Sequence, residues 1–339
     1  MTLTTPAMPY RTADYTGKRV LVTGASGILG SGVAQALVAA GAHVTVLQRS
    51  ASNIAGVREI RGSVTNTDDV SAAVDGVDAV IHIAAKVSMS GPLAEYEHVN
   101  VHGTKLLLTA AQRAGVQRWI HISSPSVAHS GDSIIGAGAE PADPETARGH
   151  YAATKAAGEL LALAADSSTF RVLVLRPHLM WGPGDTQLTE RIIDRARQNR
   201  LPLLDGGTAL VDTLFTVNAV EAIVAALKAV DQTHGEALVL TNGQPRPIGE
   251  MIRRIAVAGG AQEPTLDLPA ALAKTAGSVI EKFWDAEKRG DEPPITRFLA
   301  EQMSTAHWFD QRRTREVLRW QPRISLAEGF ELTRQFYTR

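Results

Sequence analysis

The sequence predicts an α/β protein built on a doubly wound parallel sheet, with a smaller second domain made from two separate stretches of chain. Three observations support this fold class. Short runs rich in β-branched residues alternate with alanine-rich helical patterns through the first half of the 339 residues. These short runs are apolar throughout, as is typical of strands covered by helices on both faces. After Arg176-Pro177 the alternation gives way to turn-rich segments.

The predicted elements follow one another in strand–helix order. The strands expected in the sheet are Arg19–Thr23, His43–Leu47, Val57–Arg61, Ala79–Ala84, Trp119–Ser123, Phe170–Leu175 and Ala237–Leu240. The expected helices are Ile28–Ala40, Gly103–Ala114, Tyr151–Ala164, Thr189–Asn199, Ala219–Val230 and Pro269–Lys288. We therefore place the sheet domain in residues 15–178 and 216–241, and a substrate-binding region in residues 179–215 and 242–339.

The composition excludes several classes of function. Lys and Arg number 34 against 35 Asp and Glu, for a net charge of −1, so no nucleic-acid or anionic membrane partner is expected. The chain has no cysteine, and the pair His98 and His102 lacks an accompanying carboxylate motif, so we expect no metal site. No apolar run approaches the roughly 20 residues that span a bilayer, and the N-terminus lacks the apolar core of a signal peptide. We therefore expect a cytoplasmic protein.

A glycine-rich turn joins the first strand to the first helix. Its sequence is Thr23-Gly24-Ala25-Ser26-Gly27-Ile28-Leu29-Gly30. Three glycines at this spacing allow a tight turn, close approach of the backbone to a pyrophosphate, and close packing of the helix. The helix N-terminus favours negative charge. The sequence therefore predicts a Rossmann-type dinucleotide site, with contacts from Thr23, Gly24, Ser26, Gly27, Ile28 and Gly30.

The residues after the second strand predict which nicotinamide cofactor is used. A site that prefers NAD places a carboxylate there for the ribose 2′-hydroxyl. This chain has Gln48-Arg49-Ser50 instead, with no acid nearby in the sequence. Arg49 can pair with a 2′-phosphate in fork geometry, and Ser50 can donate a hydrogen bond to it. We therefore expect NADP(H) to be preferred over NAD(H), with a solvated surface Arg49 as the alternative.

Tyr151 and Lys155 begin an alanine-rich helix. Their i, i+4 spacing puts the phenol and the ammonium on one helix face, with Cβ atoms about 5–6 Å apart. A nearby ammonium favours the phenolate, so we expect the pKa of Tyr151 to lie below its reference of about 10. The pattern predicts Tyr151 as a proton donor or acceptor and Lys155 as a residue that holds the nicotinamide ribose.

Taken together, Thr23–Gly30, Asn100, Ser123–Val127 and Tyr151–Lys155 resemble the extended short-chain dehydrogenase/reductase family. The resemblance implies Ser124, Tyr151 and Lys155 as catalytic residues, with Ser123 as the rival serine. It also casts Asn100 as a catalytic residue that shapes its helix or joins a proton relay, and a plain helix cap is the alternative. The further cofactor contacts that it implies are Ala84, Ala85, Lys86, Tyr151, Lys155, Pro177 and His178.

Three longer stretches, residues 175–188, 211–219 and 292–309, resemble the 3β-hydroxysteroid dehydrogenase branch of this family. Within the branch they are most similar to bacterial 2-alkyl-3-oxoalkanoate reductases of olefin biosynthesis. The resemblance implies NADPH-dependent reduction of a hydrophobic β-keto acid, or the reverse oxidation of a β-hydroxy acid or sterol. It also implies a homodimer formed through the helices at residues 103–114 and 151–164. The expected substrate contacts are Ser126, His178, Trp181, Phe283 and Trp284.

Two other functions remain open. Nucleotide-sugar epimerases and dehydratases use the same serine, tyrosine and lysine. A dehydratase is expected to carry an Asp-Glu pair where Pro125-Ser126 stands, and nucleotide-sugar enzymes typically carry Phe-Asn in the stretch that holds Pro177-His178. A non-catalytic NADP-binding sensor is the second alternative, although such a protein would not need all three catalytic residues.

Overall fold

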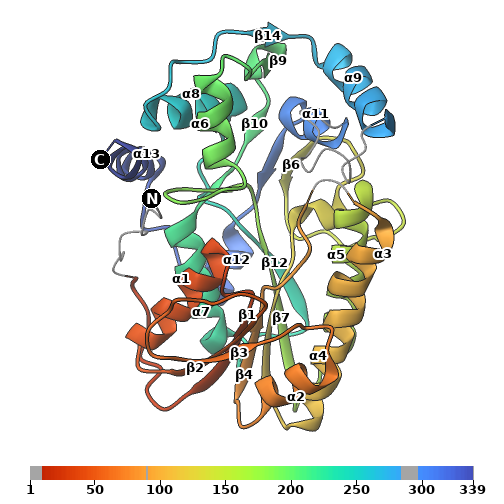
Figure 1. The fold of residues 1–339 in the computed structure, drawn as a ribbon, viewed down its shortest axis with the longest axis vertical. Coiled ribbons are helices and arrows are strands. Elements are labelled where there is room, and N and C mark those ends of the chain that lie inside the picture. The colour runs from red at the N-terminus through yellow and green to blue at the C-terminus, as the bar shows by residue number, and fades with distance from the viewer. Residues whose placement is uncertain (1–9, 89–90, 284–296, 339) are drawn as a thin grey trace.

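The computed structural model describes residues 10–88, 91–283 and 297–338 (Figure 1). Its strands are β1 (Arg19–Thr23), β2 (His43–Gln48), β3 (Val57–Arg61), β4 (Ala79–His82), β5 (Arg118–Ile122), β6 (Ile134–Ala137), β7 (Arg171–Pro177), β8 (Met180–Trp181), β9 (Leu203–Leu204), β10 (Leu210–Val211), β11 (Leu214–Phe215), β12 (Glu236–Leu240), β13 (Arg246–Pro247), β14 (Asp267–Leu268) and β15 (His307–Phe309).

The α-helices are α1 (Ile28–Ala39), α2 (Thr67–Val74), α3 (Leu93–Tyr96), α4 (Thr104–Arg113), α5 (Gly149–Ala164), α6 (Thr189–Arg197), α7 (Thr216–Ala229), α8 (Ile248–Ala258), α9 (Ala270–Phe283), α11 (Arg297–Ser304), α12 (Arg312–Leu318) and α13 (Leu326–Tyr337). The described residues also form three irregular helices: a π-helix, η1 (Glu97–Gly103), and the 3₁₀ turns η2 (Pro125–Ala128) and η3 (Asp205–Gly207).

The main sheet has seven strands in the order β12-β7-β5-β4-β1-β2-β3, and every pairing in it is parallel. Helices cover both faces, which confirms the predicted doubly wound α/β class (Figure 1). One apolar core lies between the sheet and helices α1 and α7. A second core lies on the other face, under α2, α4 and α5. All seven strands end at the same edge, where an open α/β sheet binds its ligands.

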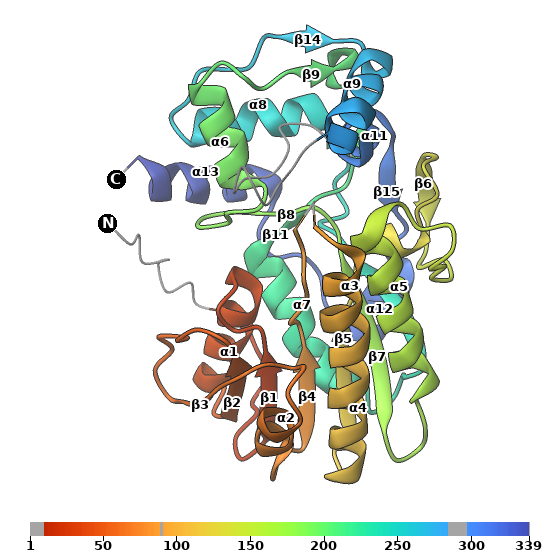
Figure 2. The same cartoon turned by 45° about the vertical axis from the view of Figure 1, so that its right-hand side comes forward.

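A smaller lobe stands beyond this edge (Figure 2). Its core contains Trp181, Phe215 and Phe330 together with apolar side chains of α6, α8 and α13. A four-stranded sheet, β13-β10-β15-β6, runs beside it. Strand β6 was not expected from the sequence, because its partner β15 lies more than 160 residues further along the chain. The short segment between β5 and α5 therefore belongs structurally with the C-terminal strands.

The helix predicted to start at Gly103 begins earlier. Helix α3 starts at Leu93 and continues through η1 into α4, so Asn100 lies inside a continuous helical segment. A π-helix inserts an extra residue per turn and often marks a functional site.

Among the helices that the structure describes, none combines the length and the apolar character that a membrane span requires.

Candidate active site

The glycine-rich turn has the geometry of a dinucleotide cradle. Gly24 has a φ of +76°, and a Cβ there would lie 2.9 Å from the backbone nitrogen of Ala84. A Cβ on Gly30 would lie 2.3 Å from the carbonyl oxygen of Gly24, so this glycine lets α1 pack against the turn. Gly27 is exposed, and a Cβ placed on it would lie 3.6 Å from its nearest neighbour, the carbonyl oxygen of Gly24. The first and last glycines therefore build the turn, and the middle one leaves its outer surface open.

The N-terminus of α1 is open as well. In the described part of the chain no side chain caps it, and the N–H of Ser31 bonds back to the carbonyl of Gly27. The N–H groups of the first turn have no intrahelical partner and attract anions. Ser26 is exposed and Ile28 is half-buried, so both lie where the sequence analysis expects the pyrophosphate. These residues fit a dinucleotide.

Thr23 does not lie on this open surface. Its side chain is completely buried, and its hydroxyl oxygen accepts hydrogen bonds from the backbone N–H groups of Ile83 and Ala84, both at 3.1 Å. The same hydroxyl lies 2.9 Å from Nδ1 of His82. The side chain of Thr23 therefore holds the end of β4 and does not point toward a ligand. The adjoining Ala84, Ala85 and Lys86 are half-buried.

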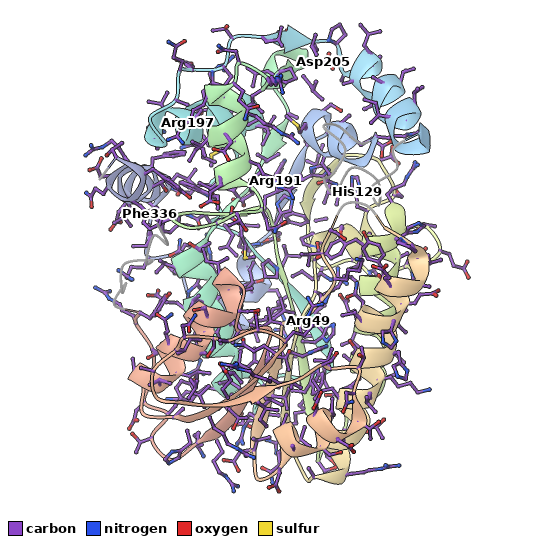
Figure 3. The ribbon with its side chains drawn as sticks, in the orientation of Figure 1. Arg49, His129, Arg191, Arg197, Asp205 and Phe336 are labelled. Carbon is purple, nitrogen blue, oxygen red and sulfur yellow. The ribbon has the colours of Figure 1, made fainter. Side chains whose placement is uncertain are left out.

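An acid on the neighbouring strand lies beside β2, and sequence reasoning missed it. Arg49 and Ser50 are exposed, and Arg49 makes no ion pair with any residue that the structure describes (Figure 3). Glu59, on the neighbouring strand β3, accepts hydrogen bonds from the backbone and the hydroxyl of Ser52, both at 2.6 Å. Its pKa is lowered to about 2 by these bonds and by Arg61. The prediction that no acid lies near this site was therefore wrong, because strand pairing brings Glu59 beside β2.

Ser124 and Tyr151 lie near each other at the edge where the strands end, and Ser124 acts to lower the pKa of Tyr151. Ser124 follows β5 and caps η2, and Tyr151 lies in the first turn of α5. The rival Ser123 is buried, and its hydroxyl has no hydrogen-bond partner among the residues that the structure describes. The geometry therefore favours Ser124 over Ser123 as the serine beside the tyrosine.

The pKa of Tyr151 departs from the expectation. Burial raises it to about 12, and the nearby Ser124 only partly opposes this rise. The predicted lowering by Lys155 was wrong for a geometric reason. Nζ of Lys155 donates to the carbonyl oxygen of Ile122 at 2.5 Å, so its charge is directed at the end of β5. The phenol therefore stays protonated at neutral pH.

Lys155 is itself buried, and burial lowers its pKa to about 8. Glu159, one turn further along α5, raises that pKa and so favours the charged form. Glu159 is fully buried and forms an ion pair with Arg176 at the end of β7, with Nε of Arg176 3.0 Å from Oε2. Sequence reasoning missed this pair. The available signals were a carboxylate four residues after Lys155 and an arginine inside an apolar strand.

Asn100 connects the two halves of the site. Its Oδ1 accepts from the backbone N–H of Lys86 at 2.7 Å, and its Nδ2 donates to the carbonyl of Lys86 at 3.2 Å. Nδ2 also lies 3.1 Å from the hydroxyl of Thr154 in α5. Asn100 is therefore not a helix cap, and it clamps the loop after β4 to the helix that carries Tyr151.

Three of the expected substrate contacts lie away from an open surface or outside the described residues. Trp181 is fully buried, donates to the hydroxyl of Thr213 at 3.0 Å and packs on Phe215 and Phe330. It is a core residue of the second lobe, so the expected substrate contact was wrong. The side chain of Phe283 and the whole of Trp284 lie outside the described residues.

His178 belongs to a buried histidine cluster. Its Nδ1 lies 2.8 Å from the carbonyl oxygen of Asp212, and its ring packs edge-on against His307 and Phe309. His307 in turn lies 3.0 Å from His129, Nε2 to Nε2. Burial lowers the pKa of His178 to about 4, so it is neutral at pH 7. Pro177 and His178 are both buried, so at the end of β7 the structure exposes little side-chain surface.

Ser126 lies beside the catalytic pair. It is half-buried, and its hydroxyl donates to Oγ of Ser124 at 2.9 Å. A cavity of about 280 Å³ opens next to this turn, between η2 and β6, but Ser124, Tyr151 and Lys155 do not line it. The cavity therefore lies beside the site and does not contain the reacting groups.

The chain matches the NAD dependent epimerase/dehydratase family over residues 20–240. It is 37% identical over 319 residues to a 2-alkyl-3-oxoalkanoate reductase of Stenotrophomonas maltophilia (strain K279a), covering 92% of this chain and 97% of that protein. A 3-beta-hydroxysteroid dehydrogenase of Mycolicibacterium neoaurum is 27% identical, with 94% and 91% covered. Among solved structures, UDP-glucuronic acid 4-epimerase from Bacillus cereus in complex with NAD has a TM-score of 0.73 and 22% identity, covering 94% of this chain and all of that chain (100%). That last similarity concerns the fold.

Proposed function

The chain belongs to the NAD-dependent epimerase/dehydratase family, within the extended short-chain dehydrogenases/reductases, and we propose that it is an NADP(H)-dependent ketoreductase acting on a hydrophobic β-keto acid. The reaction that we favour is reduction of a 2-alkyl-3-oxoalkanoate. Oxidation of a 3β-hydroxysteroid-type alcohol is the related possibility. The observation that carries the proposal is that Ser124 lies near Tyr151, with the buried Lys155 one turn further along α5.

The bound nicotinamide would supply the hydride that reduces the carbonyl carbon. Tyr151 donates the proton to the carbonyl oxygen, since burial keeps its phenol protonated at neutral pH. Ser124 hydrogen-bonds the same oxygen. Lys155 contributes positive charge close to the reacting groups. Asn100 holds the loop after β4 against α5 through its hydrogen bonds with Lys86 and Thr154.

The preference for NADP(H) rests on Arg49. Its exposed guanidinium is available to a 2′-phosphate, and Ser50 stands beside it. Glu59 lies nearby as an anion, but its oxygens are already bonded to Ser52 and Arg61. Because the carboxylate of Glu59 already accepts hydrogen bonds from the protein, we infer that Arg49 affects cofactor binding more strongly than Glu59 does. The site therefore favours NADP(H).

A long alkyl chain needs an apolar surface that removes it from water. Helix α9 exposes two large apolar side chains, with Leu272 64% and Val279 54% exposed. Phe283 and Trp284 follow on the same stretch of sequence and extend the helical apolar spacing. We infer that α9 covers the alkyl chain. Replacing Phe283 and Trp284 by alanine should raise the KM for long-chain substrates more than for short-chain ones.

We also propose a homodimer formed through α4 and α5. Leu160 on α5 is 42% exposed and is therefore available for an apolar contact with a second copy of the chain. Leu160→Arg should shift the molar mass measured by light scattering from that of a dimer to that of the 36.2 kDa monomer. A monomer in the unmodified protein would contradict this proposal.

The function is tested by following NAD(P)H absorbance at 340 nm. NADPH and NADH are offered with a 2-alkyl-3-oxo acid, and NADP⁺ and NAD⁺ with 2-alkyl-3-hydroxy acids, a 3β-hydroxysteroid and a UDP-sugar. We expect NADPH-linked turnover of the keto acid, and Tyr151→Phe should remove it by orders of magnitude while NADPH still binds. Turnover of the UDP-sugar alone would favour the epimerase/dehydratase alternative. Tight NADPH binding without any turnover would favour the sensor alternative.

A further inference from the structure

We propose that Glu59 is a positioning residue for cofactor choice, because its carboxylate fixes the loop that presents Arg49 to the 2′-phosphate of NADP(H). This inference rests on the function proposed above, since it concerns the same cofactor site. Residues 49–51 follow β2 at the edge where an open α/β sheet binds the ribose of a dinucleotide. Glu59 lies on the neighbouring strand β3, opposite Val46 of β2.

One carboxylate oxygen holds this loop at both of its ends. On the near side, Nε2 of Gln48, the last residue of β2, donates to Oε2 of Glu59 at 3.4 Å. On the far side, the backbone N–H and the hydroxyl of Ser52 both donate to the same oxygen at 2.6 Å. Only residues 49–51 lie between these two points. A loop this short, bound at both ends to one acceptor, keeps few conformations.

The two ends of the loop are also attached to the body of the sheet domain. The carbonyl of Gln48 accepts from the backbone N–H of Gly62 at 2.9 Å, and the side chain of Gln48 is buried. The hydroxyl oxygen of Ser52 accepts from the backbone N–H of Ile54 at 3.3 Å, and Ile54 packs against the core under α1. Asn53, with a φ of +54°, turns the chain between them. Glu59 therefore joins the loop to parts of the fold that are themselves fixed.

The charge of Glu59 is offset within the protein. A bare carboxylate near a bound phosphate would weaken binding by repulsion. Here Oε1 of Glu59 pairs with Nε of Arg61 at 2.8 Å, and Oε2 is bonded to Ser52. Fixing Arg49 in advance lowers the ordering cost that binding would otherwise carry. Glu59 therefore acts on the 2′-phosphate through the position of Arg49, whereas the acid of an NAD-preferring site binds the ribose itself.

The test measures by calorimetry how two adenosine analogues bind to the whole protein, without substrate. 2′,5′-ADP carries the 2′-phosphate and 5′-AMP lacks it, so the ratio of their dissociation constants reports the contact with that phosphate. For Glu59→Ala we expect 2′,5′-ADP to bind roughly five- to tenfold more weakly, with 5′-AMP changed less than about twofold. Glu59→Gln keeps an oxygen for Ser52 and should retain the affinity for 2′,5′-ADP to within about twofold. The control is Glu236→Ala, which removes another ion-paired carboxylate, at the start of β12, and should change neither dissociation constant.

Three results would overturn the inference. Unchanged or tighter binding of 2′,5′-ADP in Glu59→Ala would show that the carboxylate only repels the phosphate. An equal loss of affinity for both analogues would show general damage to the site. An equal loss in Glu59→Gln and Glu59→Ala would show that the charge matters and the hydrogen bonds to Ser52 do not. If Glu59→Ala does not fold, Ser52→Ala replaces it, since it removes one donor of the loop and should weaken 2′,5′-ADP binding roughly two- to threefold.

The proposed function has separate readouts. The unmodified protein should bind 2′,5′-ADP more tightly than 5′-AMP, and Arg49→Ala should remove this preference. A protein without the preference would refute both the proposed choice of NADP(H) and the role of Glu59. Ketoreductase turnover, followed at 340 nm, does not enter the binding measurement, so its absence would refute the proposed reaction while the binding ratios still decide the role of Glu59.

Discussion

The buried ion pair between Glu159 and Arg176 makes a sharp prediction about stability. The side chain of Glu159 is 0% exposed and that of Arg176 is 2% exposed. Nη1 of Arg176 also donates to the carbonyl oxygen of Glu140 at 2.7 Å. Glu159→Leu removes the carboxylate and leaves a guanidinium buried without its counter-charge. Breaking such a pair by removing one partner costs about 3–5 kcal/mol. Arg176→Met, which strands the carboxylate instead, should cost a similar amount.

The double variant separates the pair from the packing around it. Two apolar side chains of similar volume can replace a buried ion pair at little cost, because neither charge then has to be desolvated. Glu159→Leu with Arg176→Met should therefore lie within about 1–2 kcal/mol of the unmodified protein. For a chain of 339 residues, an unfolding entropy of roughly 2.1 cal/mol/K per residue turns a loss of about 4 kcal/mol into a fall in Tm of about 6 °C.

The assay is urea unfolding followed by circular dichroism, with Tm from calorimetry as the second measurement. All four proteins of the double-mutant cycle are compared at pH 7. A coupling free energy of at least about 3 kcal/mol is expected. If the losses in the two single variants simply add in the double variant, the pair is not coupled, and the reasoning from its burial is refuted.

Three other predictions follow from the site and the backbone. Burial lowers the pKa of Lys155 to about 8 in the folded protein, against about 10.4 in the unfolded chain. The free-energy cost of burying its charge is therefore fully present below pH 8. This cost disappears as the pH rises to about 10.4. The unmodified protein should gain about 3 kcal/mol relative to Lys155→Met over that range in urea unfolding, and parallel pH profiles would contradict the assignment. Arg49→Ala should raise the KM for NADPH roughly 10- to 100-fold and leave the KM for NADH unchanged. The control is Arg58→Ala, which changes another exposed arginine. Equal effects on the KM values of both cofactors would show that Arg49 does not bind the 2′-phosphate. Arg319 follows the last residue of α12 and has a φ of +48°. Arg319→Gly should therefore raise the free energy of unfolding by about 0.5–1 kcal/mol in urea unfolding. A lower free energy of unfolding would show that the side chain matters more than the backbone strain.

Much of the sheet domain was predictable because its signals are local. The apolar runs fall on β1, β2, β3, β4, β5, β7 and β12, with ends shifted by a few residues at most. The glycine turn and the Tyr151–Lys155 spacing are also local, since each lies within one turn or one helix. Strand β6 and the π-helix η1 were not predictable in this way. The first depends on pairing with β15, and the second lies where Asn100 contacts Lys86 and Thr154, which are far from it along the chain.

By itself the sequence determined the strand–helix order, the family and the residue types at the catalytic positions, because these depend on neighbours along the chain. Tertiary structure decided the environment of each group. It buried Tyr151 and so reversed the expected direction of its pKa, placed Glu59 beside β2, and packed Trp181 into a core. It also paired Glu159 with Arg176. The pKa of a side chain and its access to a ligand depend on desolvation and on charges that the fold brings together, and no spacing within a sequence encodes either of them.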